Sequence, residues 1–480
     1  MQGDAPSTHD LGCIPNARPC GGELCGHALD RTRSAKPFSV NRYAIAYTHF
    51  SAKVRRPVIS QQPSSPENDA SPKLPTPGWY GVEPVEGPQP EDPYTGFKEL
   101  RETQPVNLTP EGGWRLTRYD DVRRLLRAPQ AGMRLTNGLL PGQDEEIPGG
   151  GLFMLLQDPP THTRLRKLVK KAFTPRAIEA WRPKVETVTQ RLLDKVAATG
   201  EMDLIDDLAR PVPATLICEL LGVPTEDQDD FTQWTADATH GLLTIRGLGD
   251  DAIGKRVEAA STSLIGYFNN LIEERRSNLG DDLLSVLISA EEEGDKLDPL
   301  ELLSQSIGLL IAGFETTIGL IGNGLTTLIR HPDEMAKLRA NPELAPSAVE
   351  ECLRYSGPIV ATIRVLHEDM EFGGFTIPTD AEIVAVLAAA NRDPEVFEDP
   401  ERFDITRFTD DKNAPAQLSF GGGAHFCLGA HLARIETEIA IRSLVERFDD
   451  LTLVNPTTQW GRSLFRVPGH VPITFTASNR

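Results

Sequence analysis

The chain of 480 residues carries 49 basic and 69 acidic side chains, which gives a formal net charge of −20 at pH 7. Binding to nucleic acid or to an anionic membrane requires a basic face, so this acidic balance argues against both kinds of partner. Six cysteines are too few for a disulfide scaffold and favour a reducing, cytoplasmic setting. The most apolar stretch has Glu315 at its centre, and we therefore expect no membrane anchor.

Residues 1–75 differ in composition from the rest of the chain. Their last part is rich in proline and serine and cannot bury enough apolar surface to offset the entropy lost on ordering. We expect a disordered leader, or a start upstream of the natural one, followed by a single domain over residues 76–480. The leader contains four possible zinc ligands, but their spacing matches no standard zinc finger: Cys13, Cys20, Cys25 and His27.

The sequence of the first part of this domain predicts a helical region between two long loops. A short strand at Trp114 runs into a helix, with Asp120 in a capping position. Residues 133–153 form a glycine-rich loop and residues 244–254 form a second loop, and long loops in compact domains are often functional. The pattern over residues 161–243 is helical, with interruptions at Pro175, Pro183 and Pro224.

One long helix has clear start and stop signals. Asp298 is a good N-cap, Pro299 suits the first helical position, and Glu301 completes a capping box. Nothing interrupts the pattern before His331-Pro332, so about 32 residues span roughly 48 Å. The middle is apolar on all sides, which predicts a helix through the interior. Small residues on one stripe leave room beside it: Gly308, Ala312 and Gly313.

Shorter elements follow the long helix. The pattern predicts, in order, a helix over 347–355, extended segments over 361–365, 370–375 and 382–386, a turn-rich stretch over 391–408, a glycine-rich loop over 420–429 and a helix over 430–448.

Cys427 lies in that glycine-rich loop, just before the last helix. The N–H groups at a helix N-terminus stabilise a thiolate, so we expect Cys427 to be ionised. Glycines let the backbone come close to a flat partner. A cysteine nucleophile with His425 as its base, a zinc ligand and a buried structural cysteine are the alternatives for a single cysteine.

The pattern Phe420-x-x-Gly423-x-His425-x-Cys427-x-Gly429 resembles the haem-binding loop of the cytochrome P-450 family. The resemblance runs from about residue 79 to the C-terminus and is closest to the soluble bacterial members. It implies a mainly α fold with small β-sheets (α+β), a triangular, helix-rich prism around haem b (iron protoporphyrin IX) with a long central helix. It also implies that Cys427 is the axial ligand of the iron, and that Gly423 and Gly429 let the loop approach the porphyrin.

The same resemblance assigns the polar residues in the middle of the long helix. A single threonine there is by default bonded back to its own helix in a packing groove. The segment around Glu315 and Thr316 resembles the family's acid–alcohol pair, in which the threonine stabilises dioxygen during its activation and the acid supports proton delivery. These two are the predicted catalytic residues.

Glu351 and Arg354, three apart on a helix, would alone indicate a solvated surface pair. They resemble the family's core E-x-x-R pair, which holds the turn-rich stretch through a further arginine. The expected further arginine is Arg402.

His162 and Arg166 share one helical face, four residues apart. A basic solvated face is the alternative interpretation, and it suits their neighbours. By resemblance, four residues bind the haem propionates, which need cationic hydrogen-bond donors: His162, Arg166, Arg364 and His425. The remaining basic residues of this region predict a docking surface for an acidic ferredoxin: Arg164, Lys167, Lys170, Lys171 and Arg176.

The resemblance implies a haem-thiolate monooxygenase that inserts one oxygen atom from O2 into a hydrophobic small molecule of terpenoid, steroid, fatty acid or polyketide type. Electrons come ultimately from NAD(P)H through a separate ferredoxin and ferredoxin reductase, because the haem domain uses nearly the whole chain. We expect a monomer. A peroxygenase and a non-catalytic haem-binding sensor are the alternatives, although neither requires the acid–alcohol pair.

The expected pocket walls are mostly apolar and suit a hydrophobic ligand: the two long loops, Ile311, Ala312, 359–362 and 464–467. One departure from the family pattern is Asp380, after Pro378-Thr379, where a glycine is frequent. We expect an altered turn there and nothing further.

Overall fold

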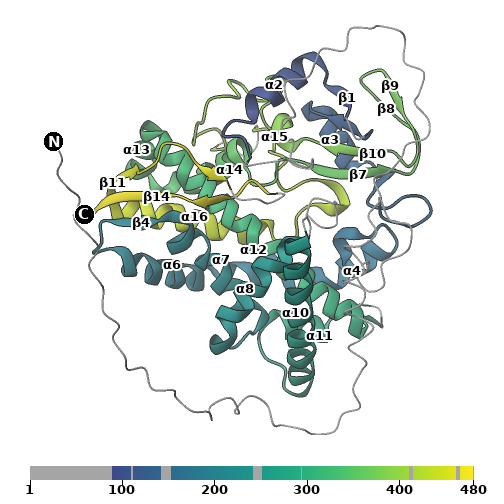
Figure 1. Ribbon diagram of the computed structural model, residues 1–480, viewed down its shortest axis with the longest axis horizontal. Coiled ribbons are helices and arrows are strands. Elements are labelled where there is room, and N and C mark those ends of the chain that lie inside the picture. The colour runs from purple at the N-terminus through teal and green to yellow at the C-terminus, as the bar shows by residue number, and fades with distance from the viewer. Residues whose placement is uncertain are drawn as a thin grey trace, which may run out of the picture. The chain divides into compact units, whose positions relative to one another are not determined.

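The structure, a computed structural model, describes residues 89–109, 112–141, 153–241, 251–292, 294–409, 414–460 and 465–478. Helices dominate it, and the strands form small sheets (Figure 1). The predicted mainly α fold with small sheets is therefore confirmed. The predicted leader, residues 1–75, lies outside the described residues.

The α-helices are α2 (Tyr94–Thr103), α3 (Tyr119–Arg127), α4 (Thr161–Val169), α5 (Pro175–Glu179), α6 (Arg182–Val196), α7 (Pro211–Leu221), α8 (Gln228–Thr239), α10 (Asp251–Ser277), α11 (Leu283–Ser289), α12 (Pro299–Arg330), α13 (Pro332–Ala340), α14 (Ala345–Ser356), α15 (Leu387–Ala390) and α16 (Ala430–Arg447). Short 3-10 turns are η3 (Met154–Leu156), η4 (Lys170–Phe173), η6 (Thr225–Asp227), η7 (Pro342–Leu344) and η8 (Gly423–His425), and η5 (Leu204–Ala209) is a π-helix.

The main sheet has the order β1 (Val106–Leu108), β2 (Trp114–Leu116), β10 (Glu382–Ala385), β7 (Thr362–Leu366) and β3 (Ala131–Gly132). Its strands pair antiparallel except β2 and β10, which are parallel. A second sheet has the order β11 (Phe448–Leu453), β14 (Pro472–Ala477) and β4 (Glu201–Asp203). Three two-stranded ribbons are β5 (Glu291–Glu292) with β6 (Asp295–Lys296), β8 (Met370–Phe372) with β9 (Phe375–Ile377), and β12 (Gln459–Trp460) with β13 (Pro468–His470).

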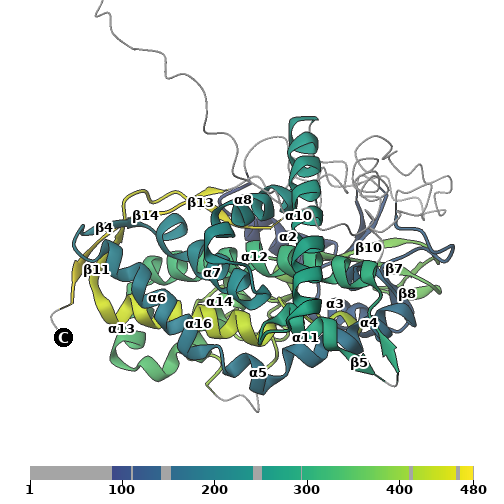
Figure 2. The ribbon, with the colours of Figure 1, turned by 90° about the horizontal axis from the view of Figure 1, so that it is seen from below.

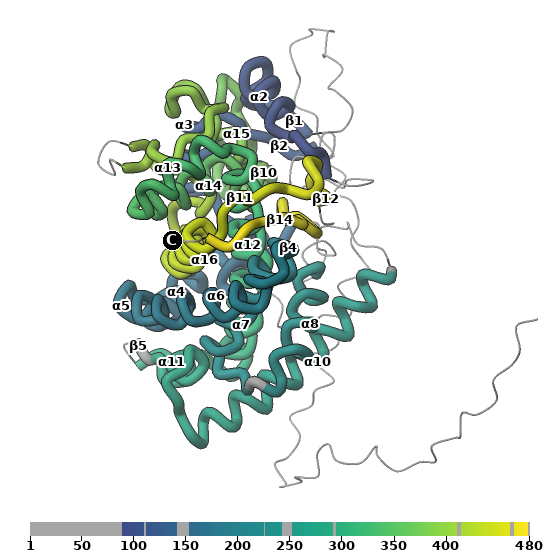
Figure 3. The backbone as a smooth tube through the Cα atoms, turned by 90° about the vertical axis from the view of Figure 1, so that its left-hand side faces the viewer, coloured from purple at the N-terminus to yellow at the C-terminus, as the bar shows by residue number. Residues whose placement is uncertain are grey.

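The predicted long helix is confirmed as α12, with 32 residues. Asp298 accepts hydrogen bonds from Leu300 N and Glu301 N, and Glu301 returns one to the Asp298 backbone, so the capping box is complete. By length and apolar composition α12 is long enough to cross a membrane, but most of it is buried inside the protein as a core helix. It packs against α7, α14 and α16, which lie beside it in Figure 2 and Figure 3.

Two hydrophobic cores meet along α12. Its first half, which includes Ile307 and Leu310, packs in a core with α7, α8, α10 and α11. Its second half, which includes Phe314 and Ile318, packs in a core with α6, α14, α16 and the second sheet. The change from one core to the other falls at Ala312, which is exposed although the residues along most of the helix are buried.

Several local predictions need correction. Asp120 is the second residue of α3 and caps nothing; the carboxylate of Asp393 accepts the hydrogen bond from Tyr119 N instead. The helical pattern over 161–243 also breaks at β4, because Glu201–Asp203 pairs with β14. The loop predicted over 244–254 ends earlier, since α10 begins at Asp251, and residues 242–250 lie outside the described part.

The Glu351–Arg354 pair is confirmed as a core pair, because both side chains are fully buried and joined by two hydrogen bonds of 2.7 Å. Arg354 also donates to the carbonyls of Asn391, Pro400 and Arg402 and so fastens the turn-rich stretch to α14.

The predicted third arginine was wrong: Arg407, not Arg402, contacts Glu351, through Nε at 3.2 Å. The Arg402 side chain is 59% exposed and faces Asp404. Asp399 has a φ of 44°, and its carbonyl accepts a hydrogen bond from the Arg407 guanidinium.

This arrangement predicts different costs for the two arginines. Arg407→Ala leaves the buried Glu351 carboxylate with less compensation and should lower the free energy of unfolding by about 3 kcal/mol. Arg402→Ala removes only an exposed pair and should change it by less than about 0.5 kcal/mol. Denaturant unfolding of the two variants compares them directly, and equal destabilisation would contradict the assignment of Arg407.

Candidate active site

The middle of α12 presents a short open stripe between the two cores. Ala312 is exposed there, and Gly313, Glu315 and Thr316 are half-buried. The Thr316 hydroxyl donates a 2.8 Å hydrogen bond to the carbonyl of Ala312, one turn earlier. The back-bond that is the default for a single threonine is therefore present, and it leaves the lone pairs of Thr316 Oγ1 as acceptors.

Only part of the predicted room beside α12 is open. A Cβ on Gly308 would lie 2.2 Å from the ring of Phe153, so that glycine makes space for a neighbouring side chain. A Cβ on Gly313 would meet only Ile217, at 3.9 Å. The open stripe therefore begins at Ala312, one turn later than the prediction placed it.

A backbone hydrogen bond and glycines with positive φ values define the shape of the Cys427 loop. Cys427 N donates a 2.9 Å hydrogen bond to Phe420 O, and Gly421 and Gly423 take positive φ values of 72° and 64°. A Cβ on Gly423 would lie 2.3 Å from Leu126 O, so this glycine lets the loop pack on α3. A Cβ on Gly429 would enter open space.

The ionisation predicted for Cys427 does not hold for the polypeptide alone. Burial raises the pKa of its thiol. Hydrogen bonds from the N–H groups of Gly429 and Ala430 lower this pKa, as do the charges of Arg166 and Arg434, but burial outweighs them. A thiolate here needs a bound cation, since a coordinating thiol loses its proton to the metal.

The four predicted propionate ligands lie close to one another. His162 of α4 stacks on His425, with ring centroids 4.1 Å apart. Arg166, one turn after His162, donates to the carbonyl of Phe426, and Arg364 comes from β7. The structure thus brings five predicted site residues together around one loop, with Cys427 as the fifth.

Burial dominates the electrostatics of this basic cluster. Burial, and then the charges of Arg364, His162 and Arg166, lower the pKa of His425 to about 3. Burial also lowers the pKa of Arg364 to about 10, against the opposing effect of Asp158. Within the described residues neither ring nitrogen of the buried His162 has a hydrogen-bond partner. Asp158 thus acts on the cluster through its charge but does not hydrogen-bond to His162.

The sequence analysis missed two contributors. Arg434 of α16 lowers the pKa of Cys427 and stacks on Phe420 at 4.5 Å. It lies four residues after Ala430, so the helical period could have placed it on the same face. Asp158 acts on both Arg364 and His162, and no local pattern connects it with β7.

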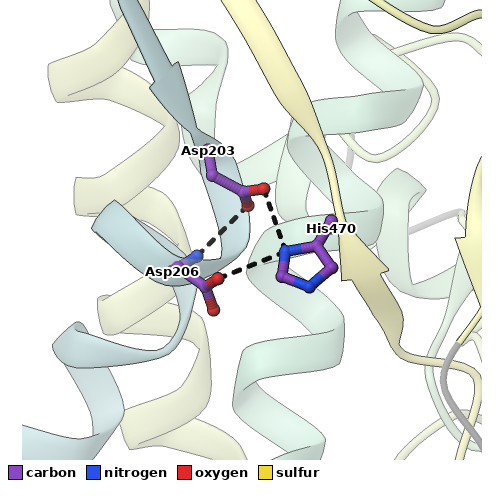
Figure 4. Close-up of side chains that lie close together, drawn as sticks. All are labelled: Asp203, Asp206 and His470. Atoms are coloured by element: carbon purple, nitrogen blue, oxygen red, sulfur yellow. Dashed lines mark hydrogen bonds and ion pairs between the residues drawn. The ribbon is translucent and has the colours of Figure 1, made fainter. Parts of the chain in front are cut away.

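A separate group of possible metal ligands has a structural explanation (Figure 4). His470 Nδ1 lies 3.3 Å from a carboxylate oxygen of Asp203 and 3.2 Å from one of Asp206. Asp203 also caps η5 through the N–H groups of Ile205 and Asp206, and Arg210 pairs with Asp206. These bonds connect β13 with the β4–η5 turn.

Comparison with known proteins gives consistent matches. The family model for Cytochrome P450 matches residues 106–460. The 6-deoxyerythronolide B hydroxylase of Saccharopolyspora erythraea is 40% identical over 403 residues, covering 80% of this chain and 96% of the relative. The vitamin D(3) 25-hydroxylase of Pseudonocardia autotrophica is 40% identical over 369 residues, covering 76% and 88%. The solved structure of the Bacillus subtilis 168 bacillaene polyketide synthase cytochrome P450 PksS is 35% identical, with a TM-score of 0.74, and covers 80% of this chain and 97% of that chain.

These matches define an oxidoreductase of the haem-thiolate class. The chain belongs to the cytochrome P450 family, and it is a monooxygenase of that family. Members use a haem, O2 and redox partners to oxidise hydrophobic substrates.

The residues of this chain fit such a haem. Two propionate carboxylates would supply further anions to the basic cluster, including acceptors for the nitrogens of His162. There is open space at Gly429, beside Cys427, and Ala312 is exposed in the middle of α12. The iron would supply the cation that Cys427 needs.

The cluster predicts opposite effects of one substitution. Arg364→Met removes a buried charge from among like charges, so the protein without haem should unfold at a higher temperature. The same change would remove a predicted propionate partner, so haem should transfer to an acceptor protein about tenfold faster. Arg118→Met, at an exposed arginine, is the control. An unchanged rate of haem transfer would contradict the assigned role of Arg364.

Proposed function

We propose that this enzyme inserts one oxygen atom from O2 into a hydrophobic substrate of the polyketide type. The observation that carries the proposal is the open stripe of α12, where an acid and an alcohol lie between two apolar cores. The polyketide class is supported by the names of the macrolide hydroxylase and of PksS, both similar over 80% of this chain. The vitamin D(3) hydroxylase makes a steroid-like substrate the nearest competitor.

The described pocket walls suit such a substrate. Ile311, Ile359 and Phe465 are partly buried apolar residues, and Thr362 adds one hydroxyl. The charged wall residue Arg466 donates to the carbonyls of Pro90 and Glu91 and stacks on Trp460. Arg134, in the described part of the first loop, donates to the carbonyls of Leu156 and Gly138. The other predicted wall segments, 142–152, 242–250 and 464, lie outside the described residues.

We assign the site residues as follows. Cys427 would hold the haem iron through its Sγ, and His162, Arg166, Arg364 and His425 would hold the propionates. When bound, the haem supplies the redox chemistry that activates dioxygen. Thr316 Oγ1, whose proton is engaged by Ala312 O, accepts a hydrogen bond on the open side of α12, and Glu315 delivers protons there. Residues 76–480 act as one haem domain.

The electrons come from NAD(P)H through a ferredoxin reductase and a ferredoxin, in the cytoplasm, to a monomeric enzyme. Exposed basic residues after the haem-binding part of α4 support docking of an acidic ferredoxin: Lys167, Lys170, Lys171 and Arg176. Arg164 is removed from the predicted set, because Asp295 and Glu301 already pair with it.

The proposal predicts a substrate order. The haem-loaded protein is titrated with a macrolactone without sugars, a steroid and a long-chain fatty acid, and the spectral shift of binding is recorded. We expect the macrolactone to bind most tightly and to yield a hydroxylated product with surrogate partners. Preference for the steroid or fatty acid would contradict the polyketide class.

A far-red-shifted Soret band of the reduced carbon monoxide complex tests thiolate ligation by Cys427.

The proposed roles of Thr316 and Glu315 predict that a Thr316 variant uses electrons without forming a matching amount of product. Thr316→Ala removes the acceptor on the open stripe, so hydrogen peroxide formed per NADPH should rise several-fold while product falls. Thr326→Ala is the matched control, since Thr326 makes the same back-bond, to Gly322 O, in a buried part of α12. Equal coupling in the two variants would contradict the role of Thr316.

The docking surface predicts a change in salt dependence. Reversing the charge of Lys170 should slow reduction by an acidic ferredoxin at low ionic strength and flatten its dependence on salt. Glu substitution at the exposed Arg118, outside the surface, should leave both unchanged. An unaltered salt dependence for the Lys170 variant would rule out this surface.

A further inference from the structure

Asp380 does more than alter a turn. It lies between β9 and β10 with a φ of 61°, a left-handed conformation that is uncommon for residues other than glycine. Its carboxylate accepts two hydrogen bonds from Thr136, one from the backbone N at 2.6 Å and one from Oγ1 at 2.7 Å. The expectation of a local change only is therefore wrong, because the side chain holds a residue 244 positions away.

Thr136 lies in the middle of the stretch 133–141, which leaves the main sheet at β3. Asp158 holds the start of this stretch by accepting from Met133 N at 2.8 Å and Arg134 N at 3.0 Å. A turn follows, in which Leu135 N donates to Leu139 O. Thr136 and its neighbours are exposed, so Asp380 provides a second attachment point beyond Asp158.

The stretch borders the site described above. Met133 Sδ lies 3.5 Å from an Arg364 guanidinium nitrogen, within the basic cluster. At the other end of the same loop, the ring of Phe153 packs on Gly308 of α12, and Met154 N donates to Gln305 at 3.1 Å. The described ends of the loop therefore lie on the two elements that carry Arg364 and Thr316.

We propose that Asp380 is a positioning residue for ligand entry: by holding Thr136 it fixes the stretch 133–141 at the edge of the haem pocket and slows the passage of bulky ligands. The proposal rests on the proposed function, since it takes this pocket as the place where ligands reach the haem. Its test therefore includes one measurement that does not need the haem.

Asp380→Gly is a suitable variant, because it removes the carboxylate and places at a positive φ the residue that tolerates it best. Its folding should therefore not suffer. Asp450→Gly is the matched control: Asp450 also has a positive φ, 56°, and also accepts from a threonine hydroxyl, that of Thr476 at 2.8 Å, but it lies in the second sheet.

The first measurement is amide hydrogen exchange. In Asp380→Gly the Thr136 amide should exchange about fivefold faster, as expected for the loss of hydrogen bonds of ordinary strength. The amides of Met133 and Arg134, held by Asp158, should keep their rates, and Asp450→Gly should change none of the three. Unchanged exchange at Thr136 would overturn the proposal.

The second measurement is stopped-flow binding of two haem ligands to the haem-loaded protein, imidazole and an azole with bulky aryl groups. Asp380→Gly should raise the association rate of the bulky azole about fivefold and leave that of imidazole unchanged. Equal changes for both ligands, or none, would overturn the role in entry even if Thr136 exchanges faster. If the reduced carbon monoxide complex lacks the spectrum of a thiolate-ligated haem, the proposed function is refuted instead. The exchange rates would then test only whether Asp380 holds Thr136.

Discussion

The site depends on one long helix that two hydrophobic cores share. Ile307 and Leu310 fix the first half of α12 in one core, and Phe314 and Ile318 fix the second half in the other. Burial of this much apolar surface holds both halves in place. Because close-packed interiors transmit strain and do not deform continuously, the small residues between the cores cannot shift to fill the space beside them. The open stripe at Ala312 follows from that constraint.

The second constraint is an imbalance of charge. Burial opposes the charged forms of Arg364 and His425, and it opposes the thiolate of Cys427. A ligand that carries two negative charges and a metal cation would relieve each of these unfavourable effects of burial. Natural sequences break the rules of packing and pairing mainly at functional sites. The conflict within the polypeptide is thus itself evidence for the cofactor of the family.

Features that this chain shares with its family and features of its own occupy different places. The Glu351–Arg354 pair is fully buried, where changes are costly, whereas the Cys427 loop and the stripe of α12 are partly exposed. Asp380 lies on an exposed turn, at a position where the family resemblance implies that glycine is frequent. By the proposal above, its side chain modifies access to the haem without disturbing haem binding, in keeping with the rule that one fold can host many functions.

The sequence by itself determined the features whose signals are continuous along the chain. The capping box and the following proline define α12 because start and stop signals are local, and one unbroken loop carries the Cys427 motif. His162 and Arg166 followed from the helical period.

The tertiary structure alone decided which distant groups meet. It selected Arg407 over Arg402, because only the folded chain brings the Arg407 guanidinium to Glu351 while the Arg402 side chain stays exposed beside Asp404. It raised the pKa of Cys427, because burial is produced by the whole fold whereas the helix N-terminus acts locally. It joined Asp380 to Thr136, since a hydrogen bond between residues so far apart in the chain exists only after the sheet has formed.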